Sequence, residues 1–244
     1  MTEPLFLAPL DGPVVGGEVT LTGQEGHHAA EVRRIKVGES IWVSDGAGTA
    51  IRGPVVRTDK GAITVAIEEV VHAAERGVRY VAVQALPKGD RAELAVEVLT
   101  ELGIDEIVPW QATRSVVRWA PDRVERGLTR WRSCAREAAK QSRRFRVPTV
   151  SMPMTTTELA LRIEQTALTV VLHETAETPL ADLTLPNSGE IMFIVGPEGG
   201  LTDAEVATFT AAGGRTALIS DAVLRTSTAG VVALAQLQAL AARD

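Results

Sequence analysis

A glycine-rich loop follows an apolar segment in the last quarter of the chain. The loop reads Gly196-Pro197-Glu198-Gly199-Gly200, and the capping-box sequence Thr202-Asp203-Ala204-Glu205 predicts that a helix begins just after it. Glycines at such a turn allow unusual backbone dihedrals and let a ligand approach the N–H and C=O groups closely. Ligands of open α/β sheets bind outside the carboxyl ends of strands. The pattern therefore predicts either a small-molecule site or a plain tight turn.

The loop lacks the two commonest phosphate-binding patterns. It has neither the GxGxxG spacing of dinucleotide-binding folds nor the Gly-Lys-Ser/Thr ending of a phosphate loop. Glu198 also places a negative charge where a phosphate would lie. These features argue against a phosphate-loop nucleotidase.

Arg225 is a second candidate for chemistry. It stands in the run Leu224-Arg225-Thr226, before the apolar segment 226–242, which is predicted to form the last helix. A guanidinium can stabilise a developing negative charge through charge-assisted, often bidentate hydrogen bonds. An ion pair with a surface carboxylate would explain the same residue, so spacing alone leaves its role open.

Basic residues are concentrated between positions 114 and 146. This stretch holds eleven arginines and lysines against three acidic residues, although the whole chain has a net charge of −6. Such a local field suits a phosphate-rich partner that is met at one face, but it is also found on solvated helix faces. Glu137 and Gln141 are four residues apart and share a helical face with Ser133. They could contact a base or simply bond to each other.

The elements that position these residues fall into two groups. Residues 1–73 contain several short strand-like runs and one short helix near 27–34, which predicts a small β-barrel. In residues 74–244, strands alternate with helices, which predicts an α/β domain with a mostly parallel sheet. Strands are expected in the first group at 18–22, 40–44, 51–57 and 62–71, and in the second at 78–86, 106–109, 167–172 and 191–195.

Three helices of the second group carry recognisable signals. Asp90 is predicted to cap a helix with Leu94, Val98 and Leu102 on its apolar face, and Gly103 ends it. Further helices are predicted at 121–141 and after the capping-box sequence that begins at Thr155.

Composition narrows the class of protein. A 45% hydrophobic content is enough for a packed core, and no apolar run reaches the roughly 18 residues that span a bilayer. A single cysteine excludes an internal disulfide, and the four histidines lack metal-ligand spacing. Without a signal-peptide pattern at the start, we expect a cytoplasmic protein that binds neither metal nor membrane.

Several motifs in a fixed order resemble one family. They are Leu86-Pro87-Lys88-Gly89-Asp90-Arg91, Thr100-Glu101-Leu102-Gly103-Ile104, Arg114-Ser115-Val116-Val117, Glu137-Ala138-Ala139-Lys140-Gln141-Ser142, the glycine-rich loop and Leu224-Arg225-Thr226. Together they resemble the RsmE family, 16S ribosomal RNA uridine N3-methyltransferases of the SPOUT class. His28, Val32-Arg33-Arg34 and Gly38 resemble the PUA-like domain that begins members of that family. The likeness extends over nearly the whole chain.

The resemblance implies the fold and the partners. It implies a PUA-like β-barrel for RNA binding in residues 1–73 and a methyltransferase domain in 74–244, with a parallel sheet and a C-terminal trefoil knot. It further implies a homodimer that binds S-adenosylmethionine in the knotted loops and acts on 16S ribosomal RNA or the small ribosomal subunit.

The resemblance also assigns roles to individual positions. The implied cofactor contacts lie in the segments 172–174, 196–200 and 219–225 and at Thr228. The principal ones are Leu172, His173, Glu174, Gly196, Pro197, Glu198, Gly199, Gly200, Ile219, Ser220, Val223, Leu224, Arg225 and Thr228. The implied RNA contacts are His28, Arg33, Arg34, Lys36, Lys88, Arg91, Arg114, Gln141, Arg143 and Arg144.

Arg225 and Glu137 are the catalytic candidates. Uracil N3 must lose a proton as it attacks the methyl group, and the negative charge that develops spreads onto the carbonyl oxygens. We expect Arg225 to stabilise that charge. Glu137 is a candidate general base, although no histidine or carboxylate is an obvious one.

The last motif departs from the family pattern, which usually reads Leu-Gly-x-Arg-Ile-Leu-Arg-Thr-Glu-Thr-Ala. Ser220, Ala222 and Ser227 replace its glycine, first arginine and glutamate. Two alternatives therefore stay open: a SPOUT enzyme that methylates another RNA position, and a ribosome-assembly factor that binds RNA without catalysis.

Overall fold

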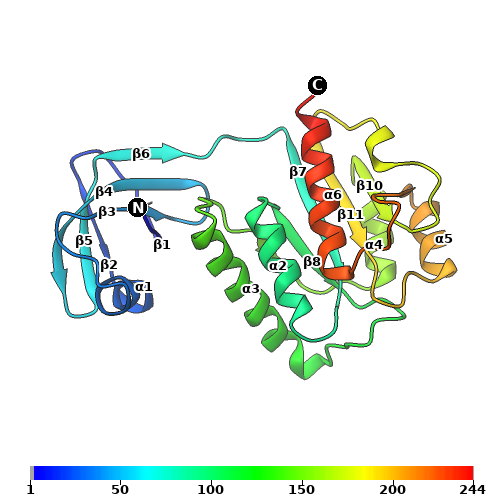
Figure 1. The fold of residues 1–244 in the computed structure, drawn as a ribbon, viewed down its shortest axis with the longest axis horizontal. Helices are drawn as coiled ribbons and strands as arrows, with labels where there is room; N and C mark the ends of the chain where they lie inside the picture. The colour runs from blue at the N-terminus through cyan, green and yellow to red at the C-terminus, as the bar shows by residue number, and fades with distance from the viewer. Residues whose placement is uncertain (1–2, 244) are drawn as a thin grey trace. The chain divides into compact units, whose positions relative to one another are not determined.

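The computed structural model describes residues 3–243, which form two compact units (Figure 1). The first unit contains the chain up to Glu75 together with Ala139–Val147, and the second contains Arg76–Ala138 and the chain from Pro148 onward. The sequence pattern placed residues 139–147 in the second domain, because they read as the end of a helix and the turn after it. The structure groups them with the first unit instead.

The first unit is built on a curled sheet of six strands: β1 (Leu5–Leu7), β2 (Glu18–Leu21), β3 (Ser40–Ser44), β4 (Thr49–Asp59), β5 (Ala62–Ala66) and β6 (Glu69–His72). The order is β1-β3-β4-β5-β2, with β6 also paired to β4. A shift of register between Val55 and Arg57 interrupts the long strand β4, and such bulges bend a strand. The core of this unit includes Phe6, Leu21, Ile41 and Ile51. Beside the sheet lie α1 (Gly23–His27) and the π-helical turn η1 (His28–Val32).

Residues 139–147 are anchored in this first unit by polar and aromatic contacts. Lys140 Nζ lies 3.1 Å from Glu25 Oε1, and both side chains are buried. The rings of Trp42 and Phe145 have centroids 5.1 Å apart, and Ser44 Oγ donates to the Phe145 carbonyl at 2.9 Å. A buried lysine needs such a partner because an isolated charge is strongly disfavoured there.

The second unit contains a fully parallel sheet of six strands: β7 (Val78–Ala85), β8 (Glu106–Trp110), β9 (Thr149–Val150), β10 (Leu168–Leu172), β11 (Gly189–Val195) and β12 (Arg215–Ala217). Its order is β12-β10-β11-β7-β8-β9. The central strands are almost continuously apolar because helices cover both faces. The predicted α/β domain with a parallel sheet is confirmed.

The helices of this unit form two layers (Figure 1). On one face α2 (Arg91–Glu101) packs against α6 (Thr226–Ala241). On the other, α4 (Thr156–Ile163) and α5 (Asp203–Ala211) contribute Leu159, Ile163 and Phe209 to a core shared with Val81 and Val83 of β7. Long α3 (Val124–Gln141) follows the 3₁₀ turn η2 (Pro121–Arg123), and a second 3₁₀ turn, η3 (Leu180–Asp182), packs beside α6. No helix within residues 3–243 has the length and apolar character needed to cross a membrane.

Both predicted capping boxes form, whereas the prediction for α2 is partly wrong. Thr155 and Thr202 each cap a helix and exchange hydrogen bonds with the glutamate three residues on. Asp90 stands at the N-cap of α2, but its side chain makes no capping bond. The buried face of α2 includes Ala95 and Leu99, while Leu94 is exposed. The buried face of α2 is the one with the smaller side chains, because α6 packs closely against it.

Candidate active site

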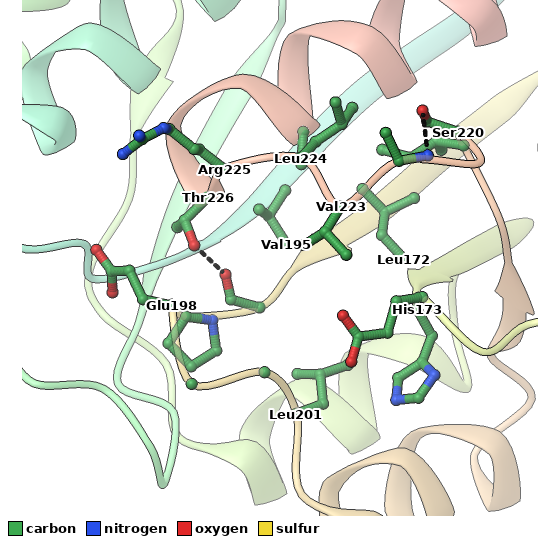
Figure 2. Close-up of a pocket in the computed structure, with 18 of the residues that line it drawn as sticks. Leu172, His173, Val195, Glu198, Leu201, Ser220, Val223, Leu224, Arg225 and Thr226 are labelled. Atoms are coloured by element: carbon green, nitrogen blue, oxygen red, sulfur yellow. Dashed lines mark hydrogen bonds between the residues drawn. The ribbon is translucent and has the colours of Figure 1, made fainter.

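A cavity of about 510 Å³ opens at the carboxyl ends of β10, β11 and β12 (Figure 2). Three segments line it, Leu172–Glu174, Val195–Leu201 and Leu218–Thr226, and Arg91, Arg114 and Ala229 complete it. All three segments are the loops that leave adjacent parallel strands, which is where open α/β sheets bind ligands. The volume falls within the range of roughly 300–1,000 Å³ that is usual for small-molecule sites.

The glycine-rich loop is held in a conformation that side chains would disturb. Gly200 has φ of +70°, a left-handed value that favours glycine, and its N–H donates to the Pro197 carbonyl at 2.9 Å. A Cβ on Gly199 would lie 3.1 Å from Cβ of Arg114. At the start of α6, Thr226 Oγ1 donates to the Gly196 carbonyl at 2.9 Å, which ties two walls of the cavity together (Figure 2).

Arg114 and Glu205 connect the loop after β8 to the same wall. Arg114 Nη1 donates to the carbonyls of Gly199 and Leu201, each at 3.1 Å. Glu205 Oε1 accepts from the Thr113 N–H at 2.8 Å, and its Oε2 accepts from Thr202. Burial alone would raise the pKa of Glu205, but the hydrogen bonds from Thr113 and Thr202 outweigh it and hold that pKa below its ordinary value.

We expect Glu205→Gln to weaken both stability and ligand binding. The glutamine NH₂ would face at least one N–H that now donates to a carboxylate, so a buried donor loses its partner, at a cost of about 2 kcal/mol. Thermal unfolding at neutral pH should show this loss, and calorimetry should show weaker binding of the ligand. Asp203→Asn, an exposed change on the same helix, is the control. A Glu205→Gln protein with the melting temperature of the control would contradict the anchoring role.

The last loop offers backbone donors to the cavity. Ser220 Oγ accepts from the Ala222 N–H at 3.1 Å, and Gln236 Nε2 donates to the Ile219 carbonyl at 2.8 Å. Among the described residues, the N–H groups of Val223 and Leu224 have no hydrogen-bond partner. A ligand with acceptor atoms can therefore bind to this loop through the backbone alone.

Charged side chains of both signs lie around the cavity. Arg225 is exposed at the N-cap of α6, and its guanidinium forms no hydrogen bond or ion pair with any residue in 3–243. Glu198 Oε1 accepts from the Lys88 N–H at 3.0 Å. In the view of Figure 2, Arg225 and Glu198 lie at one end of the cavity, and His173 and Ser220 lie at the other.

The structure brings together nearly all the residues to which the sequence assigned cofactor contacts. Thr228 is the exception, because it lies outside the cavity and its hydroxyl donates to the Arg225 carbonyl. Arg91 and Arg114, assigned to RNA, line the cavity instead of lying apart from it. The sequence reasoning missed further lining residues: Val195, Leu201, Leu218, Thr226 and Ala229. Each of them is next in sequence to an assigned position.

The other assigned residues lie outside the cavity. Glu137 is on the exposed face of α3 and does not line it. The RNA candidates of the first unit lie around η1 and in the 139–147 segment: His28, Arg33, Arg34, Lys36, Gln141, Arg143 and Arg144. Lys88 belongs to the second unit, in the loop before α2. The predicted end of the long helix at residue 141 is confirmed, because α3 ends at Gln141 and Arg143 has φ of +56°.

Two alternative chemistries find little support in the described residues. Within 3–243, no three side chains of the metal-ligating kinds gather as they would around an ion. Cys134 is partly buried, and burial, with Glu97 and Glu93 nearby, raises the pKa of its thiol to about 11. A thiol with that pKa is almost entirely protonated at neutral pH and is a poor nucleophile.

Comparison with known proteins gives a consistent result. Residues 74–238 match a family model described as an RNA methyltransferase domain, and residues 21–68 match an RNA methyltransferase PUA domain. The chain is 40% identical to ribosomal RNA small subunit methyltransferase E of Mycobacterium bovis, over 95% of this chain and 90% of that protein. It is 31% identical to the Bacillus subtilis protein of the same name, over 89% and 88%. The crystal structure of the Neisseria gonorrhoeae protein bound to S-adenosyl methionine has a TM-score of 0.86 at 27% identity, covering 98% of each chain.

Proposed function

The chain belongs to the ribosomal RNA small subunit methyltransferase E family, and we propose that it transfers a methyl group from S-adenosylmethionine to N3 of a uridine in 16S ribosomal RNA. The observation that carries this proposal is the cavity built from three strand-end loops. The Neisseria gonorrhoeae protein, whose structure was solved with S-adenosyl methionine bound, matches 98% of this chain. Its first unit, which matches an RNA methyltransferase PUA domain, supports RNA as the substrate.

The residues of the cavity fit S-adenosylmethionine. This methyl donor carries a cationic sulfonium, an ammonium and a carboxylate, as well as an adenine that needs donors and acceptors. Glu174, Glu198 and Asp221 can face its positive groups, and the partnerless N–H groups of Val223 and Leu224 can face its acceptors. Leu172 and Leu201 supply apolar walls. When bound, the cofactor supplies an electrophilic methyl group.

Arg225 is the residue that we propose for charge stabilisation. Its guanidinium stands at the rim of the cavity without an internal partner, so it is available to a uracil whose carbonyl oxygens gain negative charge. The N-terminus of α6 begins at the next residue and adds a partial positive charge there. Glu137 lies outside the cavity, on α3. It can act as the general base only if bound RNA or a second subunit brings the target nucleotide next to its carboxylate.

The finer features of fold and assembly are proposals as well. We propose a trefoil knot in the second unit and a homodimer in the cell's cytoplasm. The knot is supported by the course of the last loop, in which Leu218 pairs with Thr178 and Pro179 of the β10–β11 connection before α6 begins. The RNA candidates around η1 and in the 139–147 segment would hold ribosomal RNA.

Methyl transfer to small ribosomal subunits that lack the modification is the direct test. We expect incorporation of one methyl group, which mass spectrometry of nuclease fragments should map to N3 of a single uridine. Calorimetric titration with S-adenosylmethionine should show binding before any RNA is added. A product at another atom would favour a SPOUT enzyme of different specificity. Absence of both heat and methyl transfer would favour the non-catalytic assembly factor.

A further inference from the structure

A second cavity, of about 480 Å³, lies in the second unit between the loop 86–92 and the region from Val117 to the middle of α3. Two indole rings and four guanidinium groups line it: Trp119, Trp131, Arg118, Arg123, Arg126 and Arg130. None of these residues takes part in the cavity at the strand ends. Aromatic rings beside arginines are the combination by which proteins hold unpaired nucleotides.

The aromatic wall is closely packed. Trp131 is buried, Trp119 is partly exposed, and their rings meet edge to face with centroids 5.3 Å apart. The indole of Trp119 lies so close to α3 that a Cβ on Gly127 would be 2.6 Å from it. Glycine is unfavourable inside a helix, so its presence here is explained by this close approach. A closely packed, partly exposed indole offers a surface on which a base can stack.

The charge of the cavity is mostly unneutralised. Glu93 is its acidic lining residue, and this carboxylate is paired with Arg130. Arg123 and Arg126 are exposed, and their side chains form no hydrogen bond or ion pair with any residue in 3–243. Two free guanidiniums near an indole attract a phosphate backbone more strongly than an uncharged ligand.

The loop 86–92 separates this cavity from the one at the strand ends. Pro87 and Gly89 line the second cavity, while the N–H of Lys88 donates to Glu198 and Arg91 lines the first. A strand of RNA that crosses this loop can therefore occupy both cavities with nearby nucleotides. We propose that the second cavity holds one unpaired nucleotide flanking the methylated uridine, with its base against Trp119 and its phosphates beside Arg123 and Arg126. This proposal rests on the proposed methyl-transfer function.

Base stacking can be tested with two short single-stranded RNAs, one uridine-rich and one of the same length with abasic nucleotides. Trp119→Leu should weaken binding of the uridine-rich strand about tenfold, the effect of losing one stacked base, and leave the abasic strand unchanged. Trp119→Phe should bind both strands within about threefold of the unaltered protein, since it keeps an aromatic face. If Trp119→Leu weakens both strands equally, or neither, the base is not held there.

Phosphate contact can be tested by salt dependence. The double variant Arg123→Gln/Arg126→Gln should reduce the slope of log affinity against log salt by about 1.4, because each single-strand phosphate contact contributes about 0.7. The matched control, Arg215→Gln/Arg243→Gln, removes the same charge at the start of β12 and beyond the end of α6, both outside the two cavities. Equal slopes in the two double variants would overturn the proposal.

Two further readouts separate this proposal from its alternatives. S-adenosylmethionine affinity should be the same in all variants, which shows that the first cavity is intact. Thermal unfolding should stay cooperative in all of them, with a lower melting temperature for Trp119→Leu because it loses the packing against Trp131. If a poly-glutamate peptide displaces the uridine-rich strand as well as RNA does, the cavity binds an acidic protein segment and the proposal fails. Lack of methyl transfer by the unaltered protein would refute the proposed function, whereas the stacking comparison would still give its own answer.

Discussion

Replacement of Arg225 by alanine should lower methyl transfer by about 100- to 1,000-fold while S-adenosylmethionine binds almost as before. This is the usual effect of removing one group that stabilises charge in the transition state. The loss should appear in kcat at saturating RNA, because the guanidinium acts on charge that develops during the reaction. Rates on unmodified small subunits and calorimetry with the cofactor alone measure the two effects separately.

The position of Arg225 makes this substitution easy to interpret. It is the N-cap residue of α6, but its side chain makes no capping bond, and the helix is tied to the glycine-rich loop by Thr226 instead. Alanine should therefore leave the fold unchanged. Arg225→Lys should recover part of the rate, since it keeps the charge but loses the bidentate geometry. Turnover of Arg225→Ala equal to that of the surface variant Arg215→Ala would remove Arg225 from the mechanism.

Local signals predicted the elements that carry the site. The glycine-rich loop between an apolar strand and a capping box was predicted as one strand–loop–helix unit, and β11, Thr202 and α5 form that unit. Such a prediction succeeds because the strand, the turn and the cap each depend on residues within a few positions of one another. The roles of Arg225 and its neighbours depended on family resemblance, because an isolated arginine has many uses.

Contacts between distant segments could not be predicted in this way. The resemblance implies that Arg114 contacts RNA, yet its guanidinium bonds to carbonyls of Gly199 and Leu201, which are more than eighty residues away. The buried face of α2 could not be predicted either. The helix has two apolar faces, and the packing of α6 against one of them determines which is buried. The second cavity is a further case, because Trp119 and Gly127 reveal their contact only when α3 and the preceding loop are folded together.

Glu106→Gln should be the most destabilising of the proposed changes, by about 3 kcal/mol at neutral pH. Glu106, Glu190, Arg79 and Arg162 form one network at the amino ends of β7, β8 and β11, at the edge of the sheet opposite the glycine-rich loop. Glu106 is buried, and both of its oxygens accept hydrogen bonds, from Arg162, Arg79 and Ser151. Removal of one charge from a buried network leaves its partners unneutralised, which is far more harmful than loss of a surface pair.

The same network predicts how stability depends on pH. Burial raises the pKa of Glu106, but hydrogen bonds from Arg162 and Ser151 and the charge of Arg162 outweigh it and lower that pKa from 4.5 to about 2. Because the folded pKa is below the unfolded one, this contribution is fully present above pH 4.5 and is lost as the pH falls towards 2. At about 1.4 kcal/mol per pKa unit, the lost stability is on the order of 3 kcal/mol.

Urea unfolding between pH 7 and pH 2 therefore distinguishes the network from general acid sensitivity. The unaltered protein should lose stability through this range more steeply than Glu106→Gln, and the two curves should converge near pH 2, where the carboxyl of Glu106 takes up its proton. Glu164→Gln, an exposed change at the end of α4, should follow the unaltered protein throughout. Parallel curves for Glu106→Gln and the unaltered protein would mean that the pKa of Glu106 is the same in the folded protein and in the unfolded chain.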